Sequence, residues 1–233
     1  RVQAYIDEVN RGNRSFTEAL DELVEIERKH NQTRREQANV KTANFPFIKT
    51  VEDFDFDFQP DINKKEILEL NTLRFLDRHD NILFVGSSGT GKTHLATAIG
   101  SSCAKARNIT YFIAFEKLMN QLKSALHENR LETRLKFFAK YKVLIIDEIG
   151  YMPIDQDSAN LFFQLIARRY EKSSTMITTN MPFSRWAEIF GSATLANAIL
   201  DRLLHHSSVI SIKGPSYRLR DKRELLETHA ADE

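Results

Sequence analysis

One short run of residues constrains this chain more than any other feature. Residues 86–93 read Gly-Ser-Ser-Gly-Thr-Gly-Lys-Thr, between an apolar run at 82–85 and a helical pattern at 92–106. Glycines let the backbone curl so that its amide groups point inward, and the helix that follows adds the positive end of its dipole. Such a loop wraps a polyphosphate. The predicted nucleotide-binding residues are Gly86, Ser87, Ser88, Gly89, Thr90, Gly91, Lys92 and Thr93.

Short apolar runs alternate with helical patterns from Asn81 onward. The runs lie at 82–85, 109–115, 143–146, 175–179 and 208–212. Helices are expected at 92–106, 116–125, 129–139, 156–171, 183–190 and 194–205. Because strands that alternate with helices build parallel sheets, the sequence predicts an α/β fold with a mainly parallel sheet and helices on both faces.

The N-terminal part has a different pattern. Apolar residues recur at three- and four-residue intervals over 15–30, with Ser15 and Glu18 placed to form a capping box. Pro46 is expected to stop any helix before it. We therefore divide the chain into a short helical N-terminal module, residues 1–44, and a main domain, residues 45–233.

Two segments join this module to the first strand. Phe54, Phe56 and Phe58 alternate with aspartates, which predicts an extended segment that lays one aromatic face on the core. Residues 62–77 are expected to form one helix.

Composition excludes several classes of protein. The chain has 233 residues, of which 42% are hydrophobic and 28% charged, as in ordinary soluble proteins rather than disordered or fibrous ones. Its apolar runs are far shorter than the roughly 18 residues that a membrane span requires. A single cysteine, Cys103, favours a reducing compartment. We expect a cytoplasmic protein without a membrane partner.

Two adjacent carboxylates end the apolar run at 143–146. Ligands of parallel sheets bind beyond the carboxyl ends of the strands, so Asp147 and Glu148 are expected near the phosphate loop. Asp147 and the Thr93 hydroxyl would hold Mg²⁺, Lys92 would reach the phosphates of ATP, and Glu148 would deprotonate the attacking water. A strand that ends in Asp-Glu for structural reasons is the alternative.

Three more polar residues are candidates for the same chemistry. Asn180 follows the run at 175–179 and could bind the γ-phosphate and the water, or simply start a turn before Pro182. Arg202 could reach the γ-phosphate of a neighbouring subunit, or pair with Asp201 on the surface. Arg218 could reach the phosphates of its own subunit.

Together these motifs resemble the IstB/DnaC-like family of AAA+ ATPases. The resemblance rests on the phosphate loop with the following Gly-Lys-Thr-His-Leu, Ile-Ile-Asp-Glu-Ile-Gly-Tyr, Arg168-Arg169-Tyr170, Thr178-Thr179-Asn180, Leu200-Asp201-Arg202-Leu203-Leu204-His205-His206-Ser207 and Gly214-Pro215-Ser216-Tyr217-Arg218. It implies a five-stranded P-loop NTPase sheet, a reduced C-terminal lid, and ATP bound between subunits. It also implies that Asn180 is the first sensor, Arg202 the arginine finger and Arg218 the second sensor.

The resemblance further implies a homo-oligomer that assembles on duplex DNA with little sequence specificity and assists a transposase. Basic residues between the second and third strands would contact DNA phosphates, namely Lys123, Arg130, Arg134, Lys136 and Lys140. These residues could equally form a solvated helix face. Two alternative functions are a DnaC-like helicase loader, which would prefer single-stranded DNA, and an ATP-binding adaptor without turnover.

Overall fold

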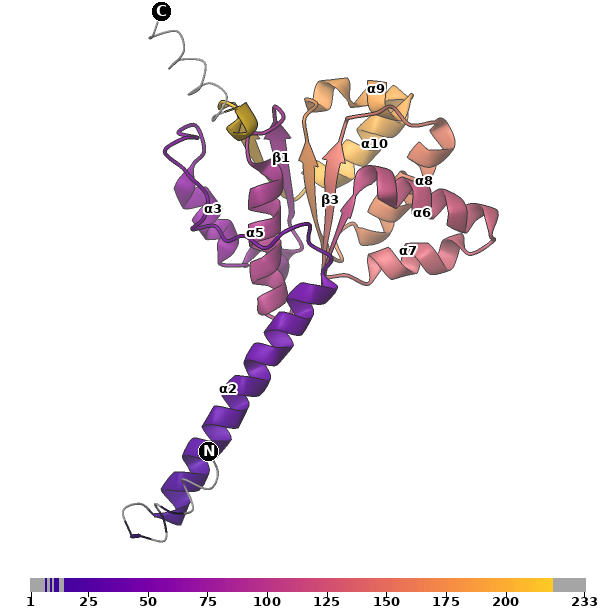
Figure 1. Cartoon of the computed structure of the whole chain (residues 1–233). Helices are drawn as coiled ribbons and strands as arrows, with labels where there is room; N and C mark the ends of the chain where they lie inside the picture. Colours follow the sequence, from indigo (N-terminus) through magenta and orange to yellow (C-terminus); the bar gives the residue numbers. More distant parts are fainter. Residues whose placement is uncertain (1–6, 8, 10, 13–14, 220–233) are drawn as a thin grey trace, which may run out of the picture.

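A computed structural model describes residues 7, 9, 11, 12 and 15–219, and its centre is one five-stranded sheet (Figure 1). The strands are β1 (Asn81–Gly86), β2 (Thr110–Ala114), β3 (Val143–Ile149), β4 (Ser174–Thr179) and β5 (Ser207–Ile212). Their order in the sheet is β2-β3-β4-β1-β5, and every neighbouring pair is parallel. The α/β prediction is confirmed, and all five carboxyl ends lie along one edge of the sheet.

Helices cover both faces of this sheet. One face carries α3 (Lys64–Asn71), α4 (Phe75–Arg78) and α5 (Lys92–Lys105). The other carries α6 (Phe115–His127), α7 (Leu131–Ala139), α8 (Gln156–Arg169), α9 (Trp186–Phe190) and α10 (Ala193–Leu204) (Figure 1). Two 3₁₀ turns, η1 (Phe183–Arg185) and η2 (Tyr217–Leu219), lie before α9 and after β5.

The apolar strands read as continuous runs because both faces are buried. In β3, Val143 and Ile145 belong to the core under α5, whereas Leu144 and Ile146 belong to the core under α6 and α8. Successive strand side chains point to opposite faces, so a run without polar residues fills both cores.

The N-terminal helix α2 (Phe16–Thr42) is longer than predicted and projects away from the sheet (Figure 1). Ser15 and Glu18 form the expected capping box. The helix continues past residue 30 because its last turn packs on the main domain. Val40 and Ala43 are buried, the Asn39 amide donates to the Ala104 carbonyl at 3.3 Å, and the Phe112 amide donates to the Ala43 carbonyl at 2.8 Å.

The extended segment predicted at 54–58 is wrong, because these residues form turns. Alternation of phenylalanine and aspartate is compatible with a strand, but an aspartate can also accept from a backbone amide two or three residues away. Phe58 N–H donates to Asp55 in this way at 3.0 Å. The rings of Phe54 and Phe58 pack around Tyr217, from the far end of the described chain, and that contact favours the turns.

The single helix predicted at 62–77 is also wrong. It is interrupted between Asn71 and Phe75, where Leu73 adopts a φ of +68° that an α-helix cannot contain. The predicted shortened lid lies mostly outside the described residues, which end at 219. Among the described helices, none is long and apolar enough to cross a bilayer.

A buried arginine holds together the amino ends of the central strands. Arg169 is 1% exposed at the end of α8, and burial lowers the pKa of its guanidinium. It donates to the carbonyl oxygens of Phe138, Tyr141 and Ser174 at 3.0, 2.8 and 2.6 Å, and to the Thr175 hydroxyl at 3.0 Å. Neutral oxygens therefore stabilise this cation, and it in turn satisfies their need for donors.

Replacing Arg169→Leu should lower the free energy of unfolding by about 3 kcal/mol or more, because several buried carbonyls lose their donor. Urea unfolding followed by circular dichroism measures the change. Arg168→Ala is the matched control, since Arg168 pairs with the exposed Glu132 on the surface and should matter little. Equal losses in the two variants would contradict the role given to Arg169.

Candidate functional site

The phosphate loop connects β1 to α5 at the carboxyl edge of the sheet. Gly89 and Gly91 adopt φ values of +78° and +96°, which glycine tolerates and other residues rarely do. Space is a second reason for glycine at both positions. A Cβ on Gly89 would lie 2.0 Å from Ser216 Oγ, and one on Gly91 would lie 2.5 Å from the Phe54 ring. The loop therefore fits closely between its neighbours.

Inside the loop, Lys92 folds back over the backbone. Its Nζ donates to the Ser87 carbonyl at 2.6 Å, and the Thr90 hydroxyl donates to the same oxygen at 2.9 Å. Burial lowers the pKa of Lys92, and the nearby Asp147 carboxylate opposes this effect. The ammonium group is thus held at the mouth of the loop, where a phosphate oxygen could replace the carbonyl as its partner.

Asp147 is buried at the end of β3 and faces this loop. It accepts hydrogen bonds from the Thr93 hydroxyl at 3.0 Å and from the Thr178 hydroxyl at 2.5 Å. Burial raises the pKa of Asp147, while the two hydroxyls act in the opposite direction. A carboxylate beside a hydroxyl is an oxygen donor pair that suits Mg²⁺, so Thr93 and Asp147 fit the predicted metal ligands.

A β-bulge brings Glu148 to the same place. Ile146 pairs with Ile177 and Ile149 with Thr179, so Asp147 and Glu148 together face the single residue Thr178. Glu148 has a φ of +67°, its N–H donates to the Thr178 hydroxyl at 2.9 Å, and its side chain is exposed. Without the bulge, adjacent residues would point to opposite faces of the sheet. The bulge lets both acids serve one pocket.

Asn180 and Arg218 line the same pocket as the phosphate loop and the two acids. A cavity of about 420 Å³ is lined by the loop residues Ser88, Gly89, Gly91, Lys92 and Thr93 together with Asp147, Glu148, Tyr151, Thr178, Asn180 and Arg218. Its size falls within the range of about 300–1,000 Å³ that is usual for ligand pockets. Asn180 Oδ1 is buried without a hydrogen-bond partner among the described residues.

Thr178 and Tyr151 are among the pocket residues that the sequence analysis did not predict. Thr178 connects Asp147 to the Glu148 backbone, and the Tyr151 hydroxyl donates to Ser88 Oγ at 3.2 Å across the loop. The sequence signal for Thr178 was weak, because β4 reads Ser-Thr-Met-Ile-Thr-Thr and the sequence alone does not show which of its four hydroxyls faces Asp147. Tyr151 follows the acidic pair by only three residues, and that proximity was the available clue.

Arg202 lies outside the pocket of its own subunit. It stands on α10, where its guanidinium donates to the Ala198 carbonyl at 2.9 Å and lies 4.7 Å from the centre of the Phe163 ring. Within the described part of the chain, no ion pair joins Arg202 to Asp201. Intrahelical bonding and ring packing hold the arginine half-buried.

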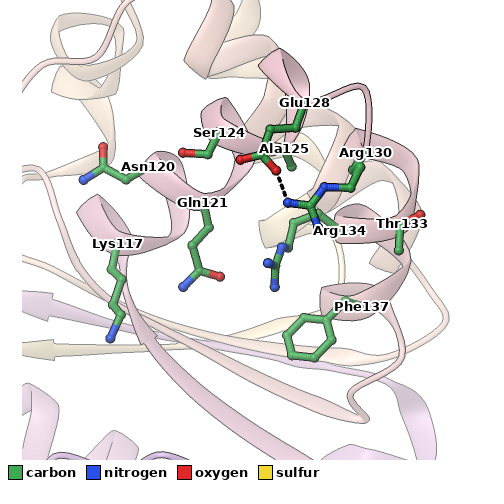
Figure 2. Close-up of a pocket in the computed structure, with 10 residues that line it drawn as sticks. All are labelled: Lys117, Asn120, Gln121, Ser124, Ala125, Glu128, Arg130, Thr133, Arg134 and Phe137. Carbon is green, nitrogen blue, oxygen red and sulfur yellow. Dashed lines mark hydrogen bonds and ion pairs between the residues drawn. The ribbon is translucent and has the colours of Figure 1, made fainter.

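The predicted DNA-binding residues form a group around α6 and α7. Arg130 and Arg134 line an open pocket of about 430 Å³ between these helices, together with Lys117 (Figure 2). Arg134 also lies over the Phe137 ring, and Arg130 pairs with Glu128. The other three lie outside this pocket: Lys123 pairs with Asp155, Lys136 with Glu132, and Lys140 lies over Phe137 and Tyr141. Much of the positive charge thus already has a partner within the protein.

Comparison with known proteins decides the family. The family described as IstB-like ATP binding protein matches residues 2–225. This chain belongs to that family. A protein of Bacillus thuringiensis subsp. berliner, named as an ATP-binding protein of insertion sequence IS232, is 55% identical over 207 residues, which are 89% of this chain and 83% of the relative. A Geobacillus stearothermophilus protein, named likewise for insertion sequence IS5376, is 47% identical over 96% of this chain and 89% of its own.

Solved structures show the same fold. The DnaC helicase loader matches with a TM-score of 0.58 and 23% identity, over 75% of this chain and 98% of that one. AMPPCP-bound DnaA from Aquifex aeolicus matches with a TM-score of 0.60 and 16% identity, over 77% and 55% of the two chains. The IstB-like protein described here is therefore a P-loop ATPase with the AAA+ fold, and the family resemblance seen in its motifs is confirmed.

Thr178→Val should reduce ATP turnover by about tenfold or more, because it removes the hydroxyl that orients Asp147 and holds the Glu148 backbone. A steady-state phosphate-release assay measures it. Thr97→Val is the matched control, since the Thr97 hydroxyl is buried in α5 and has no hydrogen-bond partner among the described residues. Unchanged turnover in Thr178→Val would show that the bulge positions the acids without this hydroxyl.

Proposed function

We propose that this insertion-sequence ATPase works as a cytoplasmic homo-oligomer that assembles on duplex DNA with ATP and assists a transposase. The main observation in support is the bulge that presents Asp147 and Glu148 together opposite the phosphate loop. A protein that only bound ATP would not need the second acid. The non-hydrolysing adaptor is therefore the less favoured alternative.

The positions of the pocket side chains support hydrolysis with Glu148 as the general base. Glu148 accepts a proton from a water molecule while the water oxygen bonds to the γ-phosphorus, and the bond from that phosphorus to the bridging oxygen breaks, which leaves ADP and phosphate. The Asn180 side chain orients the water and a γ-phosphate oxygen. Lys92 and Arg218 place positive charge beside the phosphates as negative charge shifts during the reaction.

Mg²⁺ fits the donors at one side of the pocket. Thr93 and Asp147 would hold it, and their oxygens already lie within 3.0 Å of each other. When bound, the ion neutralises charge on the β- and γ-phosphate oxygens. Thr178 keeps the Asp147 carboxylate aimed at this position, so that the protein orders one ligand before ATP arrives.

Arg202 does not line the ATP pocket of its own subunit. This supports a role in the ATP pocket of a neighbouring subunit. Its helix α10 ends at the amino edge of the sheet, just before β5, whereas the ATP pocket lies at the carboxyl edge. An arginine there can reach a γ-phosphate only if subunits stack the amino edge of one against the carboxyl edge of the next. ATP at that boundary would couple assembly to nucleotide binding.

Duplex DNA is the partner that best fits the α6–α7 region. Arg130, Arg134 and Lys117 line an open pocket of about 430 Å³ there, and a phosphate of the DNA backbone would bind to these three cations (Figure 2). Contacts of this kind recognise the backbone and not the base sequence, and they weaken as salt rises. Glu128 pairs with Arg130, and Glu132 pairs with Lys136. DNA phosphates would therefore have to displace these carboxylates from the two basic side chains.

The transposase is proposed from the family and not from a docking surface. Relatives at 55% and 47% identity are named for insertion sequences, mobile elements that also require a transposase. A DnaC-like helicase loader is the second candidate. At 23% identity, the likeness to DnaC concerns the fold alone. A preference for duplex or for single-stranded DNA therefore separates the two functions better than the fold does.

Glu148→Gln should bind ATP with little change but hydrolyse it at least about a hundredfold more slowly, because the amide cannot accept the proton. The variant should remain assembled on duplex DNA, as measured by light scattering with single-stranded DNA as competitor. Glu52→Gln, an exposed acid outside the pocket, is the control. Turnover at the normal rate would exclude Glu148 as the base. Assembly on single strands would instead favour helicase loading.

Arg202→Ala should abolish most turnover, by about a thousandfold, while each subunit still binds ATP. Mixing it with Lys92→Ala tests the role in trans. Each variant alone is inactive, but a boundary that combines an intact pocket from the Arg202→Ala subunit with Arg202 from the Lys92→Ala subunit should hydrolyse ATP. If phosphate release stays at the background level at every mixing ratio, Arg202 does not act across the boundary.

A further inference from the structure

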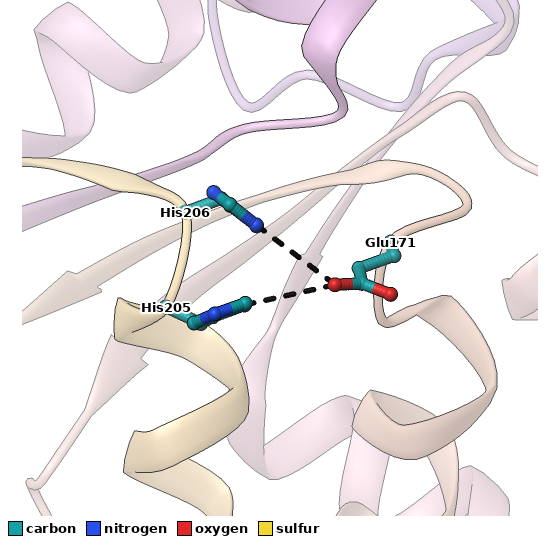
Figure 3. A group of neighbouring side chains, drawn as sticks. All are labelled: Glu171, His205 and His206. Carbon is teal, nitrogen blue, oxygen red and sulfur yellow. Dashed lines mark ion pairs between the residues drawn. The ribbon is translucent and has the colours of Figure 1, made fainter.

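A second group of metal-binding side chains lies far from the ATP pocket. Glu171 is in the turn between α8 and β4, and His205 and His206 are in the turn between α10 and β5. Figure 3 shows the carboxylate of Glu171 directed toward both imidazole rings. Because these turns precede β4 and β5, the group lies at the amino edge of the sheet, whereas the phosphate loop is at the carboxyl edge.

The distances within this group suit one metal ion. Glu171 Oε1 lies 3.7 Å from His205 Nδ1 and 3.8 Å from His206 Nε2, and the three ligand atoms lie within 4.8 Å of one another. Around a tetrahedral zinc ion, with bonds of about 2.0–2.1 Å, ligand atoms are separated by about 3.4 Å. Small side-chain rotations would therefore bring all three atoms into the first coordination sphere. This is the one such group found among the described residues.

We propose that Glu171, His205 and His206 bind one Zn²⁺ ion. Two imidazoles and one carboxylate are a ligand set that zinc uses in proteins, and imidazole favours Zn²⁺ over Mg²⁺, which prefers oxygen donors. All three side chains are exposed, so a water molecule can occupy the fourth position. The site is separate from the Thr93 and Asp147 pair and does not depend on ATP.

Tyr170 supports the arrangement as an outer partner. Its hydroxyl is hydrogen-bonded to His205 Nδ1 at 2.8 Å, and it also interacts with the Glu171 side chain. When His205 Nδ1 binds the ion, the hydroxyl remains free to donate to the Glu171 carboxylate. Outer partners of this kind orient the ligands of metal sites. The ion would then join the turn after α8 to the turn after α10.

Zinc titration of the full chain, without an affinity tag and without nucleotide, tests the site. Isothermal titration calorimetry in excess Mg²⁺ should show one Zn²⁺ per chain. The double change His205→Ala/His206→Ala should weaken binding by more than about tenfold, because even outer-shell losses cost that much. Glu171→Gln should weaken it several-fold and keeps the test valid if the double variant unfolds. Circular dichroism reports the folding of each variant.

His127→Ala is the matched control, because His127 is an exposed histidine at the end of α6 and belongs to no such group among the described residues. It should bind Zn²⁺ as the unchanged chain does. With Co²⁺ in place of Zn²⁺, the unchanged chain should give the intense visible absorption of a four-coordinate ion, and the double variant should not. The proposal is overturned if no saturable binding occurs, or if the double variant and Glu171→Gln both bind as tightly as the control.

Discussion

The nucleotide pocket depends on one buried carboxylate. Asp147 is placed where water cannot stabilise its charge, so its ionised form depends on the hydroxyls of Thr93 and Thr178 and on the nearby Lys92. These partners come from two places: Thr93 and Lys92 lie where the phosphate loop runs into α5, and Thr178 lies on β4. Any shift between β3 and β4 would therefore alter the ligands, the loop and the general base together. The bulge opposite Thr178 therefore fixes the positions of several groups of the site at once.

The opposite edge of the sheet is held by a different interaction. Arg169 satisfies carbonyls from the end of α7, the turn before β3 and the start of β4. It therefore fixes the two strands at their amino ends, while the Asp147 network joins them at their carboxyl ends. A buried cation bonded to neutral oxygens and a buried anion bonded to hydroxyls set the relative positions of β3 and β4 between them. The geometry of the ATP pocket therefore depends on both interactions.

Much of the fold and the site could be predicted because their signals are local. The phosphate loop is a contiguous motif and each strand is a short apolar run, so residues 86–93 and the five strands were found from sequence order alone. The position of Asp147 near the phosphate loop was predicted because the carboxyl ends of parallel strands lie at one edge of the sheet. Thr178 and the bulge were missed, since they depend on the register between β3 and β4, which neither strand encodes by itself. The turns at 54–58 were missed for a related reason, because they depend on the distant Tyr217.

Position also separates the two arginines named with the ATP pocket. Arg218 follows β5 and lines the pocket of its own subunit, whereas Arg202 precedes β5 and lies near the other edge. Only β5 separates the two arginines along the chain, yet it places them at opposite edges of the sheet. If Arg202 acts on ATP, it must do so from a second subunit whose amino edge meets this carboxyl edge. The same amino edge carries Glu171, His205 and His206, so an ion bound there would lie on the face that such a contact uses. Metal binding and subunit contact would then involve one surface. Subunit assembly could therefore be measured as a function of Zn²⁺ concentration, and Zn²⁺ binding as a function of assembly.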